Sequence, residues 1–164
     1  MKTFLALLSA LLFSITTFSV AAVESALPAA KDLASGARAA EQRNMPLIVM
    51  VSLAGCPYCE VIRRSHLMPL LKDDAATGPV IRQVEVNGSQ VMRDFNGEDI
   101  THKAFAQRYK VKIAPVVFFF NSRGDIVAGP LVGSMIPDFY GAYFEMALAE
   151  AQVKIRDAKP KASP

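Results

Sequence analysis

Cysteine is scarce in this sequence: 164 residues contain only Cys56 and Cys59, which lie three positions apart. Small secreted domains that depend on disulfides use four or more cysteines, so a disulfide-rich scaffold is excluded. In the chain-entropy model, a bridge across so short a loop also stabilises a fold less than a longer one would. An inert structural disulfide is therefore the weaker explanation for this pair.

Histidine and net charge are also low. Only His66 and His102 could join the two cysteines as zinc ligands, and their spacing fits no standard zinc motif. We therefore predict neither a metal nor another cofactor. The formal net charge of +3 is small and scattered, which argues against a nucleic-acid partner or an anionic membrane surface.

One long hydrophobic run is present, at the N-terminal end. Lys2 precedes an apolar stretch from Phe4 to Val20, and small residues follow it, as in a secretory signal. We predict a signal peptide over residues 1–22, cleaved after Ala21 or Ala22, and no stable membrane insertion afterwards. An uncleaved anchor is the alternative, because about 17 apolar residues are just enough to cross a bilayer.

Residues 23–164 form, by prediction, a single domain with alternating elements. The patterns predict a helix over 28–44, a strand over 45–53, a helix over 57–68, a strand over 79–87, an insert, a helix over 101–109, a hairpin over 114–133 and a helix over 135–155. This order predicts an α/β fold in which a central mixed sheet of four to five strands has helices on both faces.

Several local features carry their own expectations. Gly36 should weaken the first helix, and Pro69 should end or kink the second one near Leu67. The insert is expected to be a solvated loop, with a role in the choice of partner as the alternative, and the tail over residues 153–164 is expected to be frayed. The insert carries Arg93, Asp94 and Glu98.

The two cysteines fall between the strand over 45–53 and the helix that follows it. Pro57 then occupies the first helical position, where the missing N–H of proline has no cost. The start of the helix should stabilise a thiolate on Cys56 and lower its pKa. Cys59 lies one turn later on the same side, within reach of Cys56. This arrangement favours thiol–disulfide exchange, with Cys56 attacking and Cys59 resolving.

These features resemble the thioredoxin superfamily over about residues 31–152. The resemblance rests on the apolar strand, the "CPYC" motif, the helix after it and the segment "YKVKIAPVVFFF". Pro115 matches the proline that the family holds in the cis conformation against the disulfide, and Gly133 matches a glycine near the last strand. The "CPYC" motif itself resembles that of glutaredoxins. The export signal and the insert resemble bacterial periplasmic thioredoxin-like proteins of the SoxW type.

The resemblance implies a thioredoxin-like fold and a periplasmic thiol:disulfide oxidoreductase. Its partners would be protein thiols and disulfides, together with a membrane electron donor if the protein acts as a reductase. A disulfide-forming oxidant and a non-catalytic binding or chaperone-like module are the alternatives. The implied catalytic residues are Cys56, Cys59 and Pro115, and the implied substrate contacts are Pro57, Tyr58 and Ala114.

The sequence departs from the family pattern at two positions. Met50 stands where thioredoxins carry a buried aspartate that accepts the proton of the second cysteine, and Gly55 replaces a tryptophan. Glu60 and Glu85 are the candidates for that proton transfer. No pair of glutathione-binding residues matches the glutaredoxins, so we do not predict a glutaredoxin role.

Overall fold

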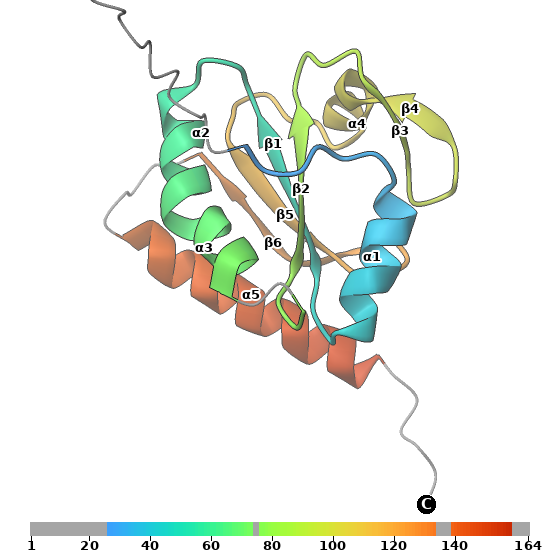
Figure 1. Cartoon of the computed structure of the whole chain (residues 1–164), viewed down its shortest axis with the longest axis vertical. Helices are drawn as coiled ribbons and strands as arrows, with labels where there is room; N and C mark the ends of the chain where they lie inside the picture. The colour runs from blue at the N-terminus through green and yellow to red at the C-terminus, as the bar shows by residue number, and fades with distance from the viewer. Residues whose placement is uncertain (1–25, 74–75, 134–138, 159–164) are drawn as a thin grey trace, which may run out of the picture.

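The computed structural model describes residues 26–73, 76–133 and 139–158 (Figure 1). The predicted signal peptide lies outside these residues. The elements, in chain order, are α1 (Leu33–Gln42), β1 (Leu47–Ser52), α2 (Pro57–Ile62), the π-helical turn η1 (Arg63–Leu67), α3 (Met68–Asp73), β2 (Val80–Glu85), β3 (Val91–Arg93), β4 (Asp99–Thr101), α4 (His102–Arg108), β5 (Val116–Phe120), β6 (Ile126–Val132) and α5 (Tyr140–Asp157). The predicted order is confirmed, and the insert supplies β3 and β4.

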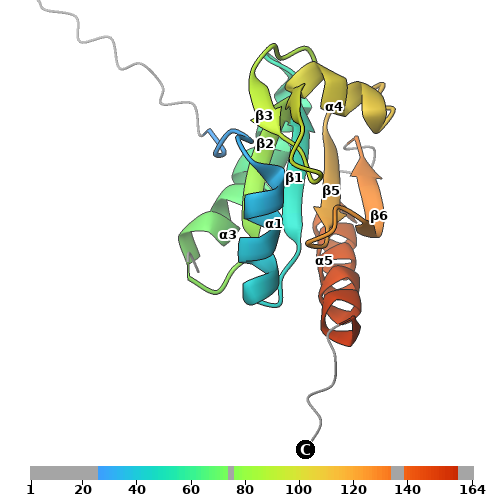
Figure 2. The same cartoon turned by 90° about the vertical axis from the view of Figure 1, so that its right-hand side faces the viewer.

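The main sheet has four strands in the order β2-β1-β5-β6. β1 runs parallel to β2 and antiparallel to β5, and β6 is antiparallel to β5. The predicted mixed sheet is therefore confirmed. β3 and β4 pair separately as an antiparallel hairpin beside α4 (Figures 1 and 2).

β1 lies at the centre of the fold and is buried along its whole length. Alternate side chains of this strand enter two apolar clusters. Ile48 and Met50 face the cluster that holds Cys59 and the buried side of α5. Val49 and Val51 face the second cluster, which includes residues of α1 and α4. Helices therefore cover both faces of the sheet, as the continuous apolar sequence of β1 predicts.

The helix after the cysteines does not end near Leu67, the first of the two predicted effects of Pro69, but its hydrogen bonding is irregular up to that residue. It continues through Pro69 to Asp73, and η1 lies immediately before the proline-containing segment. In η1 the N–H of Met68 bonds to the carbonyl of Arg63. Proline has no N–H and crowds the preceding turn, and a π turn is one of the irregularities by which a helix accommodates such a residue.

Gly36 has a packing role in α1. A Cβ atom built on this residue would lie 3.3 Å from Cδ1 of Leu47, closer than most real Cβ contacts. The glycine therefore lets α1 lie close against β1, a tertiary contact that offsets its low helix propensity.

α5 extends into the segment 153–164 that was predicted to be a frayed tail. The helix runs to Asp157, so residues 153–157 are helical rather than frayed. Its buried positions are Tyr140, Phe144, Ala147, Ala151 and Ile155, which recur at helical spacing and pack on the sheet. Among the described residues, no helix has both the length and the apolar character needed to cross a bilayer.

Asp94 corrects the expectation of a solvated insert. Its side chain is only 1% exposed. One carboxylate oxygen accepts hydrogen bonds from the backbone N–H groups of Asn96, at 2.8 Å, and Glu98, at 2.9 Å. The other oxygen accepts from Nη1 of Arg108 on α4, at 2.5 Å. Asp94 thus fixes the β3–β4 turn and joins the hairpin to α4.

We expect Asp94→Asn to lower the free energy of unfolding at pH 7 by about 1–3 kcal/mol, because a charged hydrogen-bonding group is lost from a buried site. Burial alone would raise the pKa of Asp94, but the hydrogen bonds from Arg108 and from the Glu98 and Asn96 backbone, with the charge of Arg108, outweigh it and lower the pKa. A lowered pKa stabilises the fold above the unfolded value, and this contribution disappears as the pH falls through the folded value.

Urea unfolding at pH 7 and pH 3 measures this effect. The difference between the wild type and the Asp94→Asn variant should shrink at pH 3. Asp99→Asn, in the same hairpin but 70% exposed, is the matched control and should change stability little at either pH. A difference that is independent of pH would contradict the expected role of the Asp94 carboxylate.

Candidate functional site

The two cysteines lie where β1 leads into α2. Cys56 is the N-cap residue in an extended conformation, and Pro57 is the first helical residue, as predicted. Gly55 has a φ of 72°, in the left-handed region that favours glycine. This turn gives a local reason for glycine at the position where the family carries tryptophan.

Cys56 and Cys59 are joined by a disulfide, with their Cα atoms 5.3 Å apart. The N–H of Cys59 donates a hydrogen bond to Sγ of Cys56, at 3.1 Å. Cys56 is partly exposed, whereas Cys59 is fully buried. Only the Cys56 sulfur is therefore accessible to a second molecule, and Cys59 can react only inside the domain.

The loop before β5 is distant from the cysteines in the sequence but contacts the disulfide in the folded chain. The Ala114–Pro115 peptide bond is cis. The carbonyl oxygen of Ala114 lies 4.0 Å from Sγ of Cys56, a packing contact because a disulfide sulfur has no hydrogen to donate. Gly133, at a φ of 69°, donates its N–H to the carbonyl of Pro115 at 2.7 Å. The structure thus brings Cys56, Ala114 and Pro115 together.

Pro57 and Tyr58 lie on the surface between the cysteines. Both are exposed, and the Tyr58 side chain shows 61% of its area to solvent. A molecule that approaches Cys56 would therefore meet these two side chains first. Their role in substrate binding stays a prediction.

Met50 places an apolar side chain at the position of the family's aspartate. It is fully buried in β1 and belongs to the same apolar cluster as Cys59. A thioether cannot accept a proton under these conditions, so this position gives Cys59 no acid–base group. The other candidates are Glu60, in the first turn of α2, and Glu85, the last residue of β2.

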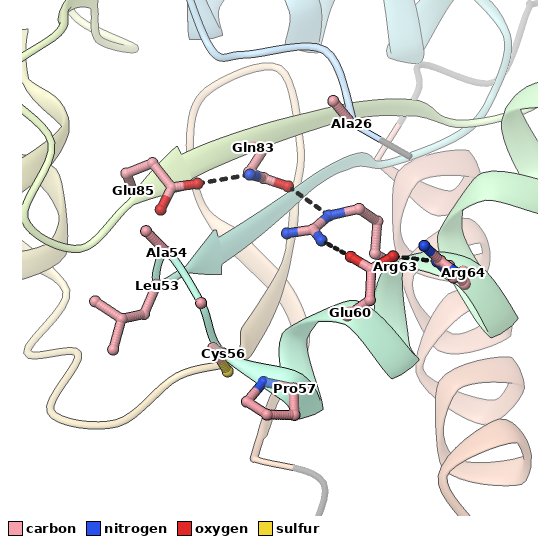
Figure 3. Close-up of a pocket in the computed structure, with 11 residues that line it drawn as sticks. Ala26, Leu53, Ala54, Cys56, Pro57, Glu60, Arg63, Arg64, Gln83 and Glu85 are labelled. Carbon is pink, nitrogen blue, oxygen red and sulfur yellow. Dashed lines mark hydrogen bonds and ion pairs between the residues drawn. The ribbon is translucent and has the colours of Figure 1, made fainter. Parts of the chain in front are cut away.

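A pocket of about 570 Å³ opens beside Cys56 and contains both of these carboxylates (Figure 3). Leu53, Ala54 and Gly55, which precede Cys56, form part of its wall. The volume lies within the range of small-molecule sites in proteins. The polar residues that line it are Glu60, Arg63, Arg64, Gln83 and Glu85.

Arg63 connects these polar groups, and the sequence analysis did not identify it. Its guanidinium forms an ion pair with Glu60, donates from Nε to Oε1 of Gln83 at 3.1 Å and donates from Nη2 to Oγ of Ser52 at 3.2 Å. Gln83 in turn donates to Glu85 at 2.6 Å. The available signal was "CEVIRR", in which arginines follow Glu60 at the helical spacings of three and four.

The two histidines have structural partners. His66, in η1, is half-buried, with its ring centroid 5.0 Å from that of Tyr140. Burial lowers the pKa of His66, and the charge of Glu145 opposes that shift. His102 is buried: its Nδ1 accepts from the Glu85 N–H at 3.2 Å, and its Nε2 lies 3.0 Å from a backbone carbonyl oxygen.

Comparison with known proteins agrees with this geometry. The family model described as a thioredoxin-like domain matches residues 33–147. A thioredoxin-fold protein from Helicobacter pylori is 21% identical, with a TM-score of 0.51 over 71% of this chain and 75% of that one. Oxidised mitochondrial thioredoxin 3 from Saccharomyces cerevisiae is 14% identical, with a TM-score of 0.50 over 76% and 94%. A search of curated proteins found no match.

At such identities the structural likeness establishes the fold alone, whereas the family match covers most of the chain. Together with the disulfide between Cys56 and Cys59, the match supports thiol–disulfide oxidoreductase activity. The chain belongs to the family of thioredoxin-like domains.

Proposed function

We propose that the protein is an exported thiol–disulfide oxidoreductase that reduces disulfides of protein partners. The observation that carries the proposal is the unequal exposure of the bonded cysteines: Cys56 is accessible and Cys59 is buried directly behind it. Exchange through a mixed disulfide needs one accessible attacking sulfur and one protected resolving sulfur.

In the proposed reaction, the Cys56 thiolate attacks one sulfur of a partner disulfide. The partner's S–S bond breaks, a mixed disulfide forms, and the released partner thiolate takes up a proton. Cys59 then loses its proton and attacks the Cys56 sulfur, so that the second partner sulfur leaves as a thiol. Two electrons pass to the partner, and the cysteine pair ends as the disulfide seen in the structure.

The proposed binding surface surrounds the accessible sulfur. Pro57 and Tyr58 lie on one side of it and Ala114 on the other, and the 4.0 Å contact between Ala114 and Cys56 supports this arrangement. In the proposal, Pro115 shapes this groove and the Ala114 backbone faces the partner chain. Export to the periplasm rests on the predicted signal peptide, and a membrane electron donor would return the cysteines to the dithiol state.

The experiment is to measure the equilibrium potential of the Cys56–Cys59 couple in defined glutathione buffers. A reductase should give a value near that of thioredoxin, about −270 mV. A value near −120 mV would identify a disulfide-forming oxidant instead. A cysteine pair that does not exchange with glutathione or dithiothreitol would support the non-catalytic binding module.

A further inference from the structure

Arg63 is a charged side chain in a buried position beside the exchange site. The side chain is only 7% exposed. Removing a guanidinium from water costs several kcal/mol unless ion pairs and hydrogen bonds compensate. Glu60, Gln83 and Ser52 supply that compensation, and Figure 3 shows the guanidinium between α2 and β2. The fold therefore keeps this charge at one defined place.

Glu60 connects this charge to Cys56. The N–H of Glu60 donates to the carbonyl of Cys56 at 3.2 Å, so the two residues are one helical turn apart. Cys56 is the N-cap residue and Glu60 lies in the first turn of α2, so the two residues are close together at the start of the helix. A free carboxylate at that position would destabilise a thiolate on Cys56 through Coulomb repulsion.

The Glu60 carboxylate is turned away from Cys56 in the structure. It lies between Arg63 and Arg64, further along the helix (Figure 3). Arg64 is 59% exposed, so solvent weakens its pairing with Glu60. Arg63 is buried and has additional anchors in β1 and β2. Of the two arginines, Arg63 is therefore the one that fixes the carboxylate.

We propose that Arg63 is a positioning residue for the thiol chemistry of Cys56: it holds the Glu60 carboxylate away from the sulfur, neutralises it, and thereby preserves the Cys56 thiolate. This inference rests on the proposed exchange function and extends it to the control of the reactive sulfur.

The first test is Arg63→Gln, which removes the buried arginine that pairs with Glu60 and keeps the exposed Arg64. Because the Glu60 carboxylate loses the positive charge of Arg63, its repulsion of a Cys56 thiolate grows, and alkylation of Cys56 by iodoacetamide at pH 7 in the reduced protein should slow about tenfold. The reduced form loses stability for the same reason. The exchange equilibrium with glutathione should therefore shift towards the disulfide by up to about tenfold, which lowers the potential of the couple by up to about 30 mV.

Glu60→Gln and the double variant make the test decisive. Removing the carboxylate alone should change both readouts in the opposite direction, because the arginines then act on the thiolate without it. The Glu60→Gln/Arg63→Gln double variant should return to within about threefold of the wild type. The matched control is the Glu150–Lys154 ion pair in α5, also four residues apart, where Glu150→Gln and Lys154→Gln should change neither readout.

The outcomes separate the possible failures. If Arg63→Gln changes nothing, or if the double variant is as slow as Arg63→Gln alone, the positioning role is wrong and Arg63 serves the fold only. If the wild-type cysteines do not exchange with glutathione, the proposed function fails. The alkylation rates still test the effect of Arg63 on Cys56 in that case.

Discussion

Replacing Cys56 with serine is expected to reduce disulfide-reductase activity at least about a thousandfold while the fold persists. The serine hydroxyl is not ionised near neutral pH and cannot form a mixed disulfide, so the attacking group is lost. The bridge closes a loop of only four residues, and the chain-entropy model gives it about 2 kcal/mol. Reduction of insulin in the presence of dithiothreitol measures activity, and thermal unfolding measures the fold.

Cys59→Ser is the matched control for this experiment. It removes the same bridge but keeps the accessible sulfur, so a mixed disulfide with the partner should form and accumulate. Mass spectrometry of the intact adduct distinguishes the two variants, since Cys56→Ser cannot produce it. Adduct formation by Cys56→Ser, or unchanged insulin reduction, would show that the attacking sulfur had been assigned incorrectly.

The parts of this structure that the sequence predicts are those with local causes. The apolar run of β1 predicts a strand buried on both faces, and Pro57 after Cys56 predicts the start of α2. Thr101 predicts the start of α4, where its side chain accepts the N–H of Ala104 at 3.1 Å. Each pattern determines its element within a few residues of itself, and each of these predictions is confirmed.

The features that escaped prediction depend on partners far along the chain. Asp94 reads as a solvated acid until Arg108 is brought beside it, 14 positions later. Arg63 has the composition of a surface charge, but Gln83 of strand β2 accepts a hydrogen bond from its Nε–H. Gly36 reads as a weak point of a helix until Leu47 packs against it. In each case a tertiary contact gives the residue a structural role that its amino-acid type alone does not indicate.

Predictions for the candidate site also succeed where the cause is local and fail where it depends on distant contacts. The spacing and local turn of Cys56 and Cys59 indicate exchange chemistry from the sequence alone, and Pro115 was placed through the resemblance. The electrostatic environment of the sulfur could not be read in this way, because Glu60 has a different effect when it is free and when Arg63 holds it. The direction of electron flow depends on that environment, so it follows from the folded arrangement rather than from the motif.

Met50→Asp is expected to cost about 3–5 kcal/mol of stability at pH 7, although it restores the residue type that thioredoxins carry at this position. Met50 is fully buried in the central strand, among apolar side chains that include Cys59. The substitution removes a packed thioether and places a carboxyl group in that apolar site. We therefore expect the apolar side chains around residue 50, and not the residue type at this position alone, to determine whether the fold tolerates a carboxyl group there.

The stability cost of Met50→Asp should depend on pH, in a direction set by the pKa of the introduced carboxyl group. Burial disfavours the carboxylate, so the pKa of the introduced Asp should be raised in the folded state. Its cost should then grow as the pH rises from the unfolded value, about 3.9, through the folded one. Urea unfolding at pH 4 and pH 8 measures this, with Met50→Leu as a volume-matched control that should cost less than about 1.5 kcal/mol at both. Equal losses for the Asp variant at pH 4 and pH 8 would mean that the carboxyl group reaches water, and that the core around Cys59 is less closed than its full burial indicates.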